Sequence, residues 1–308
     1  MHYIHIYILM SLIWTNSSKS GLCDRLIDLF IMTSFAQLYK KDLYLTWETQ
    51  PICDIQNKIW NPIRFNDYKI ENVKQYFQFP ECIHFLSNTE LQFKINSKSE
   101  KDIIFNNYLG GVYSPITFYN NFINQNNLEG YINIFQTLIH QFQPTQKLLN
   151  LLSNIPKDLI TIHLRRTDKA SIHISALNAN GIDTKDMDNL NDKTKSLINK
   201  FIDKGYQSFY FASDCPNTKK EYEHYYQTQN IINYKINEDI EQTYIDIYLM
   251  SQSKYIILSQ RHSSFSLFSS MINRTLFIYF YEDSIVNKNQ YTILNHICHI
   301  NNLEQYVF

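Results

Sequence analysis

The chain has 308 residues, of which 44% are hydrophobic and 19% are charged, and its formal net charge is −1. This length suits one large domain or two ordinary ones, and the composition argues against a disordered chain. The near-zero charge excludes a general attraction to nucleic acid or to anionic membranes, so an anionic ligand must be bound by a local site.

The first half of the chain begins with an apolar stretch and then alternates between strand and helix patterns. The expected elements are a strand at 3–14, a helix within 21–40, a short strand at 42–47 and a long helix at 131–154 that is interrupted near Pro144. Between about 50 and 130 the apolar residues show no clear period. The opening residues lack a basic start and a signal cleavage site, and they are too few to cross a bilayer.

The second half has a sharper pattern, in which apolar strands alternate with helices. We expect strands at 158–164, 208–213, 230–236, 254–259 and 275–280, and helices at 189–204, 216–227, 239–252 and 264–272. Such alternation predicts a parallel sheet covered by helices on both faces. The fold class is therefore α/β, with a Rossmann-like second half and a first half that begins as another such domain.

The five cysteines are scattered along the chain, and none belongs to a Cys-x-x-Cys pair. This pattern favours a reducing compartment and argues against a zinc site or a disulfide framework. Together with the lack of a signal peptide, it predicts a soluble, cytoplasmic protein without a transmembrane segment.

The first candidate binding loop is SSKSGLCDRL, in which Gly21 opens a helix directly after a strand. Ligands of α/β folds bind at the carboxyl ends of the strands, and free N–H groups at a helix start attract anions. The alternative is an ordinary strand-to-helix turn that is capped by Ser18 or Ser20.

The second candidate is LITIHLRRTDKAS, an apolar strand that runs into a charged loop. His163 and Arg165 alternate along the strand exit and share a face, whereas Arg166 points the other way. Paired guanidinium groups suit a diphosphate, and Asp168 is placed to orient one of them. The alternative is a solvated loop with an Arg–Asp surface pair.

Two aspartates follow or precede other strands of the second half. Asp214 follows the strand FYFAS at the start of a helix, and taken alone it is better explained as an N-cap than as a site residue. Asp246 shares the polar face of its helix with Asp239 and Gln242, and the alternative for it is plain solvation.

The fourth candidate loop contains Arg261, His262, Ser263 and Ser264 and leads into a helix. Serine hydroxyls and fresh helix N–H groups form an anion nest. The stretch DMD at 186–188 matches a metal-binding DxD motif, but it lies in a polar segment, and we interpret it as a solvated loop without metal.

These motifs together resemble those of a known enzyme family. HLRRTDK resembles the HxRRxD motif of the α1,6-fucosyltransferase group, which contains the nodulation and core fucosyltransferases. GLCDRL is similar to the GLGDRL-type first loop of that group, FASDCP to its ATDDP segment, and DIYLMSQ with SSFS to its third motif. The third motif is also similar to that of the α1,2-fucosyltransferases. The four motifs occur in family order over residues 21–272.

The resemblance implies a GT-B-like pair of Rossmann-like domains with the active cleft between them. It also implies GDP-fucose as the donor, a glycan or glycoconjugate as the acceptor, inversion at the anomeric carbon, and no metal or other cofactor. The implied domains are an acceptor-side domain at 1–155, a GDP-sugar-binding domain at 156–290, and a C-terminal segment at 291–308 that packs back on the first domain.

Carried over onto this chain, Arg165 matches the arginine of the donor phosphates, with Arg166 beside it. His163 matches a residue whose backbone meets the guanine, Asp246 the aspartate that accepts from guanine N–H groups, and Ser263 or Ser264 the serine on the β-phosphate. The remaining donor-site candidates are Gly21, Arg25, Asp214, Arg261 and Phe265.

The sequence departs from the family at several motif positions. Cys215 replaces the second carboxylate of the ATDDP segment, and Cys23 replaces a glycine of the first loop. His173 falls where core enzymes have a catalytic glutamate, so it is the candidate general base, and Asp168, Asp183 and Asp186 are the alternatives.

Two other readings stay open at this point. One is an α1,2-fucosyltransferase or a transferase of another GDP-sugar. The other, of a different class, is a catalytically silent protein that binds GDP or a glycan.

Overall fold

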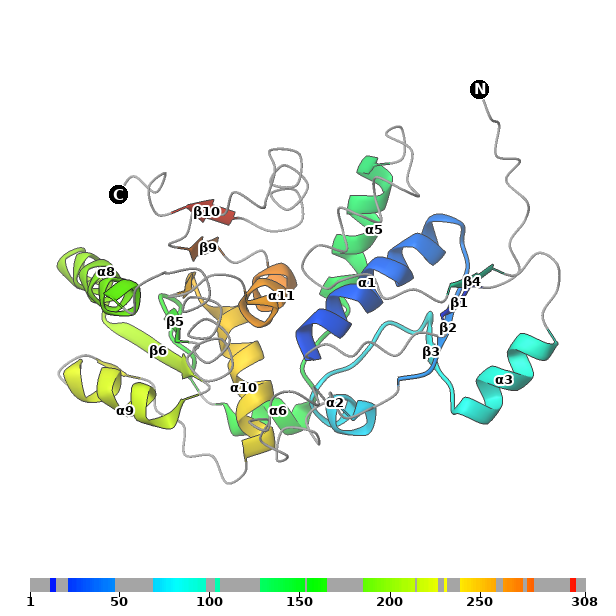
Figure 1. The fold of residues 1–308 in the computed structure, drawn as a ribbon, viewed down its shortest axis with the longest axis horizontal. Helices are drawn as coiled ribbons and strands as arrows, with labels where there is room; N and C mark the ends of the chain where they lie inside the picture. Colours follow the sequence, from blue (N-terminus) through cyan, green and yellow to red (C-terminus); the bar gives the residue numbers. More distant parts are fainter. Residues whose placement is uncertain are drawn as a thin grey trace. The chain divides into compact units, whose positions relative to one another are not determined.

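The computed structural model describes residues 12–14, 22–47, 69–97, 103–105, 128–152, 154–164, 185–213, 215–226, 230–231, 239–258, 263–273, 276–279 and 300–302 (Figure 1). Contacts group the chain into two compact units. One contains Met1–Ile55 and Ile63–Leu149, and the other contains Gln56–Pro62 and Asn150–Phe308.

The first unit is built on a parallel sheet with the strand order β3-β2-β1-β4. The strands are β1 (Leu12–Trp14), β2 (Leu43–Leu45), β3 (Ile83–Phe85) and β4 (Ile103–Phe105). The helices are α1 (Leu22–Leu38), α2 (Ile70–Tyr76), α3 (Asn88–Asn96) and α5 (Leu128–His140), and α6 (Gln146–Leu151) follows at the unit boundary. The middle strand β1 pairs with both β2 and β4, in agreement with the buried first strand expected from the sequence.

Helix α1 forms the centre of the first unit's core. Its 17 residues contain no Gly or Pro that would interrupt the helix. Nearly all of them are buried, because apolar side chains lie on all sides of the helix. It packs on α5, where the Tyr131 hydroxyl donates to the Ile31 carbonyl at 3.4 Å. Phe142 adds an edge-to-face contact with Phe30, with ring centroids 5.7 Å apart.

The second unit contains a larger parallel sheet with the order β10-β9-β8-β5-β6-β7. The strands are β5 (Ile160–Leu164), β6 (Ser208–Ser213), β7 (Asn230–Ile231), β8 (Tyr255–Leu258), β9 (Leu276–Tyr279) and β10 (Ile300–Asn302). The helices are α8 (Lys185–Asp203), α9 (Pro216–Tyr225), α10 (Asp239–Gln252) and α11 (Ser264–Asn273). This arrangement confirms the expected α/β fold with two Rossmann-like units.

The two faces of the second sheet differ in chemistry. One face joins Ile160, Ile162, Leu164, Phe209 and Phe211 to apolar residues of α8 and α9. Side chains alternate along a strand, so the residues between them point to the opposite face. There Thr161 shares a hydrogen bond with Ser253, between hydroxyl oxygens 2.6 Å apart, just after α10. Figure 1 draws α8 and α9 on one side of β5 and β6, and α10 and α11 on the other.

The structure corrects one expectation about a motif. Helix α8 begins at Lys185, so the DMD stretch at 186–188 lies at a helix start and not in a loop. The contact grouping places Asn150 and the residues after it, together with Gln56–Pro62, in the second unit; the expected domain boundary after residue 155 stays a prediction. Residues 300–302 pair with β9 in the second sheet, and the expectation that 291–308 packs back on the first domain stays a prediction.

The region between 50 and 130 contains elements that the sequence pattern does not predict. They are α2, β3, α3 and β4, and the two strands have three residues each. Three residues are too few to show a strand period. Among the described residues, no helix is long and apolar enough to cross a membrane.

Helix α8 ends in a tight glycine turn. The N–H of Tyr206 donates to the Phe201 carbonyl at 3.0 Å, and the N–H of Gly205 donates to the Ile202 carbonyl at 2.8 Å. This pair of bonds is the Schellman motif, which requires a left-handed residue after the helix. Gly205 supplies it with φ +88, and the rings of Phe201 and Tyr206 pack edge to face across the turn.

We predict that Gly205→Ala lowers the free energy of unfolding of the second unit by about 1 kcal/mol, because a Cβ disfavours the left-handed conformation. Gly130→Ala is the matched control, since Gly130 lies within α5 and neither glycine has an atom within 4 Å of an added Cβ. The control is expected to stabilise by up to about 1 kcal/mol. Urea unfolding measures both, and equal effects would contradict the role of the turn.

Candidate active site

The structure describes six of the predicted site residues. These are Arg25, His163, Asp246, Ser263, Ser264 and Phe265. The other candidates lie outside the described residues, namely Gly21, Arg165, Arg166, Asp168, His173, Asp183, Asp214, Arg261 and His262. Arg25 belongs to the first unit, where it is buried on α1 with its guanidinium carbon 5.9 Å from the ring centroid of Trp47.

His163 joins the end of β5 to the start of α11. Its Nδ1 shares a hydrogen bond with the Ser266 hydroxyl, and its ring lies 5.7 Å from that of Phe265. Both His163 and Ser266 are buried. The structure therefore brings together two segments that the sequence places in separate motifs, HLRR and SSFS.

Ser263 directly precedes the first turn of α11. Its carbonyl accepts from the N–H of Leu267 at 3.1 Å, which is the first bond of the helix. Its hydroxyl is buried, and within the described part of the chain it has no hydrogen-bond partner. A buried hydroxyl without a partner is costly unless a ligand or water meets it. A helix start of this kind is suited to an anion.

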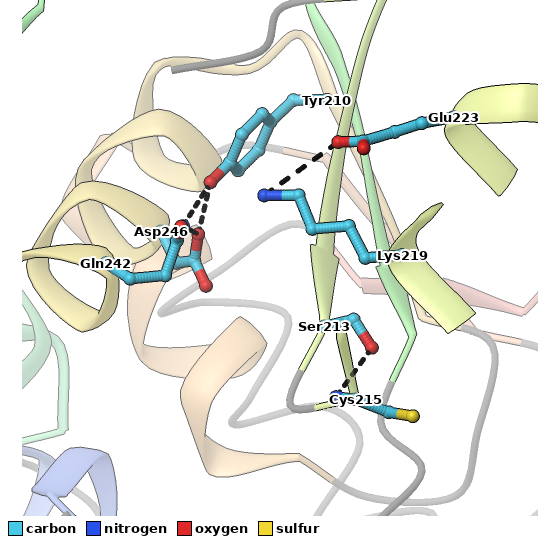
Figure 2. Close-up of polar contacts among 7 residues, drawn as sticks. All are labelled: Tyr210, Ser213, Cys215, Lys219, Glu223, Gln242 and Asp246. Atoms are coloured by element: carbon cyan, nitrogen blue, oxygen red, sulfur yellow. Dashed lines mark hydrogen bonds and ion pairs between the residues drawn. The ribbon is translucent and has the colours of Figure 1, made fainter. Parts of the chain in front are cut away.

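Asp246 lies inside the second unit and is not on a solvated helix face, which corrects one reading of the sequence. Only 7% of the residue is accessible to solvent. The hydroxyl of Tyr210 on β6 and the amide of Gln242 both donate to its Oδ1, and the same amide lies 2.6 Å from the Tyr210 oxygen (Figure 2). Tyr210 was not predicted as a site residue, and the feature that could have marked it in the sequence is its hydroxyl within the apolar strand SFYFAS.

The carboxyl ends of β5 and β6 are held together by Ser213. Its hydroxyl donates to the Leu164 carbonyl at 2.6 Å and accepts from the Cys215 N–H at 3.1 Å. The chain leaving β5 is therefore fixed beside the start of α9 up to Leu164. That is the point at which the predicted arginine loop begins.

Helix α9 adds a charged pair beside Tyr210. Lys219 Nζ lies 4.0 Å from Glu223 Oε1 and 5.1 Å from the centroid of the Tyr210 ring (Figure 2). Burial raises the pKa of Glu223, while Lys219 and Lys220 oppose that shift. Lys219 therefore already pairs with a carboxylate of its own helix.

The described residues contain no group of three or more His, Cys, Asp or Glu side chains that would hold a metal ion. The expectation of a metal-independent reaction also concerns carboxylates outside the described residues, and it stays a prediction. The arrangement described here offers a buried carboxylate for N–H donors and a hydroxyl-lined helix start for an anion.

Comparisons with known proteins identify a fold but no sequence family. No family model and no curated protein sequence matches the chain. Among solved structures, a mutant of Arabidopsis thaliana FUT1 in complex with GDP matches with a TM-score of 0.53 and 11% identity, over 90% of this chain and 71% of that one.

Two further matches have lower TM-scores. The fucosyltransferase NodZ from Bradyrhizobium aligns at 11% identity and a TM-score of 0.44, over 85% of this chain and 93% of that one. POFUT1 in complex with GDP-fucose aligns at 11% identity and a TM-score of 0.47, over 91% and 99%. The likeness to FUT1 shows that this chain has the same fold, and the GT-B-like class expected from the sequence is thereby confirmed.

We predict that Ser266→Ala lowers the free energy of unfolding by about 1–3 kcal/mol, because the buried Nδ1 of His163 loses a hydrogen-bond partner. Ser269→Ala is the matched control. Ser269 is equally buried on α11, but its hydroxyl only bonds back to the Phe265 carbonyl at 2.9 Å, within the same helix. The control is expected to change stability by less than about 0.5 kcal/mol. Urea unfolding that gives equal losses would contradict a specific role of the His163–Ser266 bond.

Proposed function

We propose that this protein is a glycosyltransferase that transfers fucose from GDP-fucose to a hydroxyl group of a glycan, with an α1,6 linkage favoured. The observation that supports it most is the contact of His163 with Phe265 and Ser266, because it joins two of the four motifs at one edge of the sheet. The FUT1-like fold is compatible with this function and does not by itself define it.

The donor phosphates are proposed to meet the start of α11. The buried hydroxyl of Ser263, which has no hydrogen-bond partner among the described residues, supports this placement, and Ser264 follows it as the first helix residue. The guanidinium forks of Arg165 and Arg166 are proposed to grip the same diphosphate. Their charge would stabilise the departing GDP as the glycosidic bond breaks.

The guanine is proposed to meet Asp246. A carboxylate accepts hydrogen bonds only, and guanine presents two N–H donors on its Watson–Crick edge. The burial of Asp246 strengthens such a contact, since water competes less for the carboxylate.

The acceptor side rests on the sequence alone. We propose inversion at the anomeric carbon without a metal ion, with His173 as the general base that takes the proton of the acceptor hydroxyl. Asp168, Asp183 and Asp186 are the alternatives for that role.

The proposal is tested first by nucleotide binding. We predict that GDP raises the thermal stability of the protein more than UDP or ADP at equal concentration. A ligand at a hundred times its dissociation constant adds about 2.7 kcal/mol to the free energy of unfolding. Equal shifts with ADP and GDP would contradict a guanine site. Release of GDP from GDP-fucose in the absence of acceptor then distinguishes an enzyme from a protein that only binds the nucleotide.

We predict that Arg165→Ala lowers turnover of GDP-fucose by on the order of a hundredfold, as for loss of a preorganised charge stabiliser. Arg165→Lys is the matched variant, and we expect it not to restore turnover, because an ammonium cannot grip two phosphate oxygens side by side. Steady-state kinetics measure both variants. Near-normal turnover of the lysine variant would remove Arg165 from the proposed site.

A further inference from the structure

The carboxylate of Asp246 is enclosed by the second unit at mid-helix. Its neighbours on α10, Ile245 and Ile247, are buried, as is Tyr244. An ionised carboxylate at such a position is costly unless donors surround it. The donors that contact it therefore fix its orientation.

Two of those donors converge on a single oxygen. The Tyr210 hydroxyl and the Gln242 amide both donate to Oδ1 of Asp246, and the amide also donates to the Tyr210 oxygen at 2.6 Å (Figure 2). A carboxylate only accepts, so the nitrogen of the amide must face it. Tyr210 has one hydroxyl hydrogen and accepts from Gln242, so that hydrogen points at Asp246. The three hydrogen bonds among Tyr210, Gln242 and Asp246 therefore fit one arrangement of donors and acceptors.

Tyr210 is itself held in place. It lies within β6, in register with Thr161 of the central strand β5, and it is fully buried. Lys219 approaches its ring to 5.1 Å from the centroid. Burial and the charge of Asp246 raise the pKa of Tyr210 well above its ordinary value, so the phenol keeps its proton and stays a donor.

We infer that Tyr210 and Gln242 are positioning residues that fix the Asp246 carboxylate in one orientation and thereby set the base preference of the donor site. This inference rests on the proposed function, in which Asp246 accepts from guanine. The torsion that turns a carboxylate is broad in a free side chain. A carboxylate that turns cannot meet the N1–H and the exocyclic amine of guanine together.

The test compares GDP with IDP, because hypoxanthine has the N1–H of guanine but lacks the exocyclic amine. Isothermal calorimetry gives the ratio of the two dissociation constants for each protein. Tyr210→Phe and Gln242→Met should each reduce the preference for GDP about tenfold, the loss typical of one hydrogen bond to a charged group, with IDP binding retained. A loss of folded protein alone would weaken GDP and IDP equally.

The matched control is Tyr222→Phe. Tyr222 is a second buried tyrosine of the same unit, and its hydroxyl donates to Asn191 at 3.1 Å. Its variant should keep the GDP:IDP ratio of the unaltered protein. Thermal unfolding checks every variant, and Gln242, which is only half-buried, carries the test if Tyr210→Phe does not fold.

Asp246→Asn separates this inference from the proposed function. If that variant loses the preference for GDP while Tyr210→Phe and Gln242→Met keep it, guanine reading stands and the positioning role is wrong. If Asp246→Asn keeps the preference, or the unaltered protein binds no GDP, the base assignment is wrong and the inference falls with it. Loss of the preference in all three variants supports both.

Discussion

The alternation of side chains along β5 and β6 is the constraint on which the second unit depends. Ile160, Ile162 and Leu164 of β5, with Phe209 and Phe211 of β6, belong to the apolar core shared with α8 and α9. Between them, Thr161, His163 and Tyr210 are each hydrogen-bonded to a side chain in or just after α10 or α11. A one-residue slip in register would exchange the two faces, so the strand pattern fixes both at once.

The two faces hold their helices in different ways. An apolar face tolerates small displacements, because dispersion contacts have little directionality. The hydrogen-bonded face does not, since each donor must meet its acceptor within a narrow range of distance and angle. Helices α10 and α11 are therefore held by directional hydrogen bonds; α10 carries Asp246, and Ser263 directly precedes α11. Precision at a proposed ligand site comes here from buried polar pairs.

The sequence predicted β5, β6 and β8 of the second sheet well because these strands are four to six residues long, are mostly apolar and lie between clear helices. It failed between residues 50 and 130, where three-residue strands show no period. The sequence was also compatible with two roles for Asp246, a site residue or a solvated residue on the helix surface. The deciding partner, Tyr210, is 36 residues away along the chain, and a helical pattern says nothing about so distant a neighbour. The hydrogen bond between His163 and Ser266 joins residues 103 positions apart. From the sequence, only the order of the motifs suggested that these two segments lie together.

The strand order has a consequence for how the chain is made. β5 lies between β6 and β8 in its sheet. β8 is synthesised only after β6, β7 and three intervening helices, so Ile160 can pair with Tyr255 only late in synthesis. Until then β5 has a row of unpaired backbone N–H and C=O groups along one edge, on a strand whose side chains are all destined for the interior. Such non-local pairing slows folding, and it leaves an unpaired, aggregation-prone strand edge on the nascent chain. During synthesis, the strand that lies at the centre of the finished sheet is therefore at first an edge strand, open to pairing with other chains.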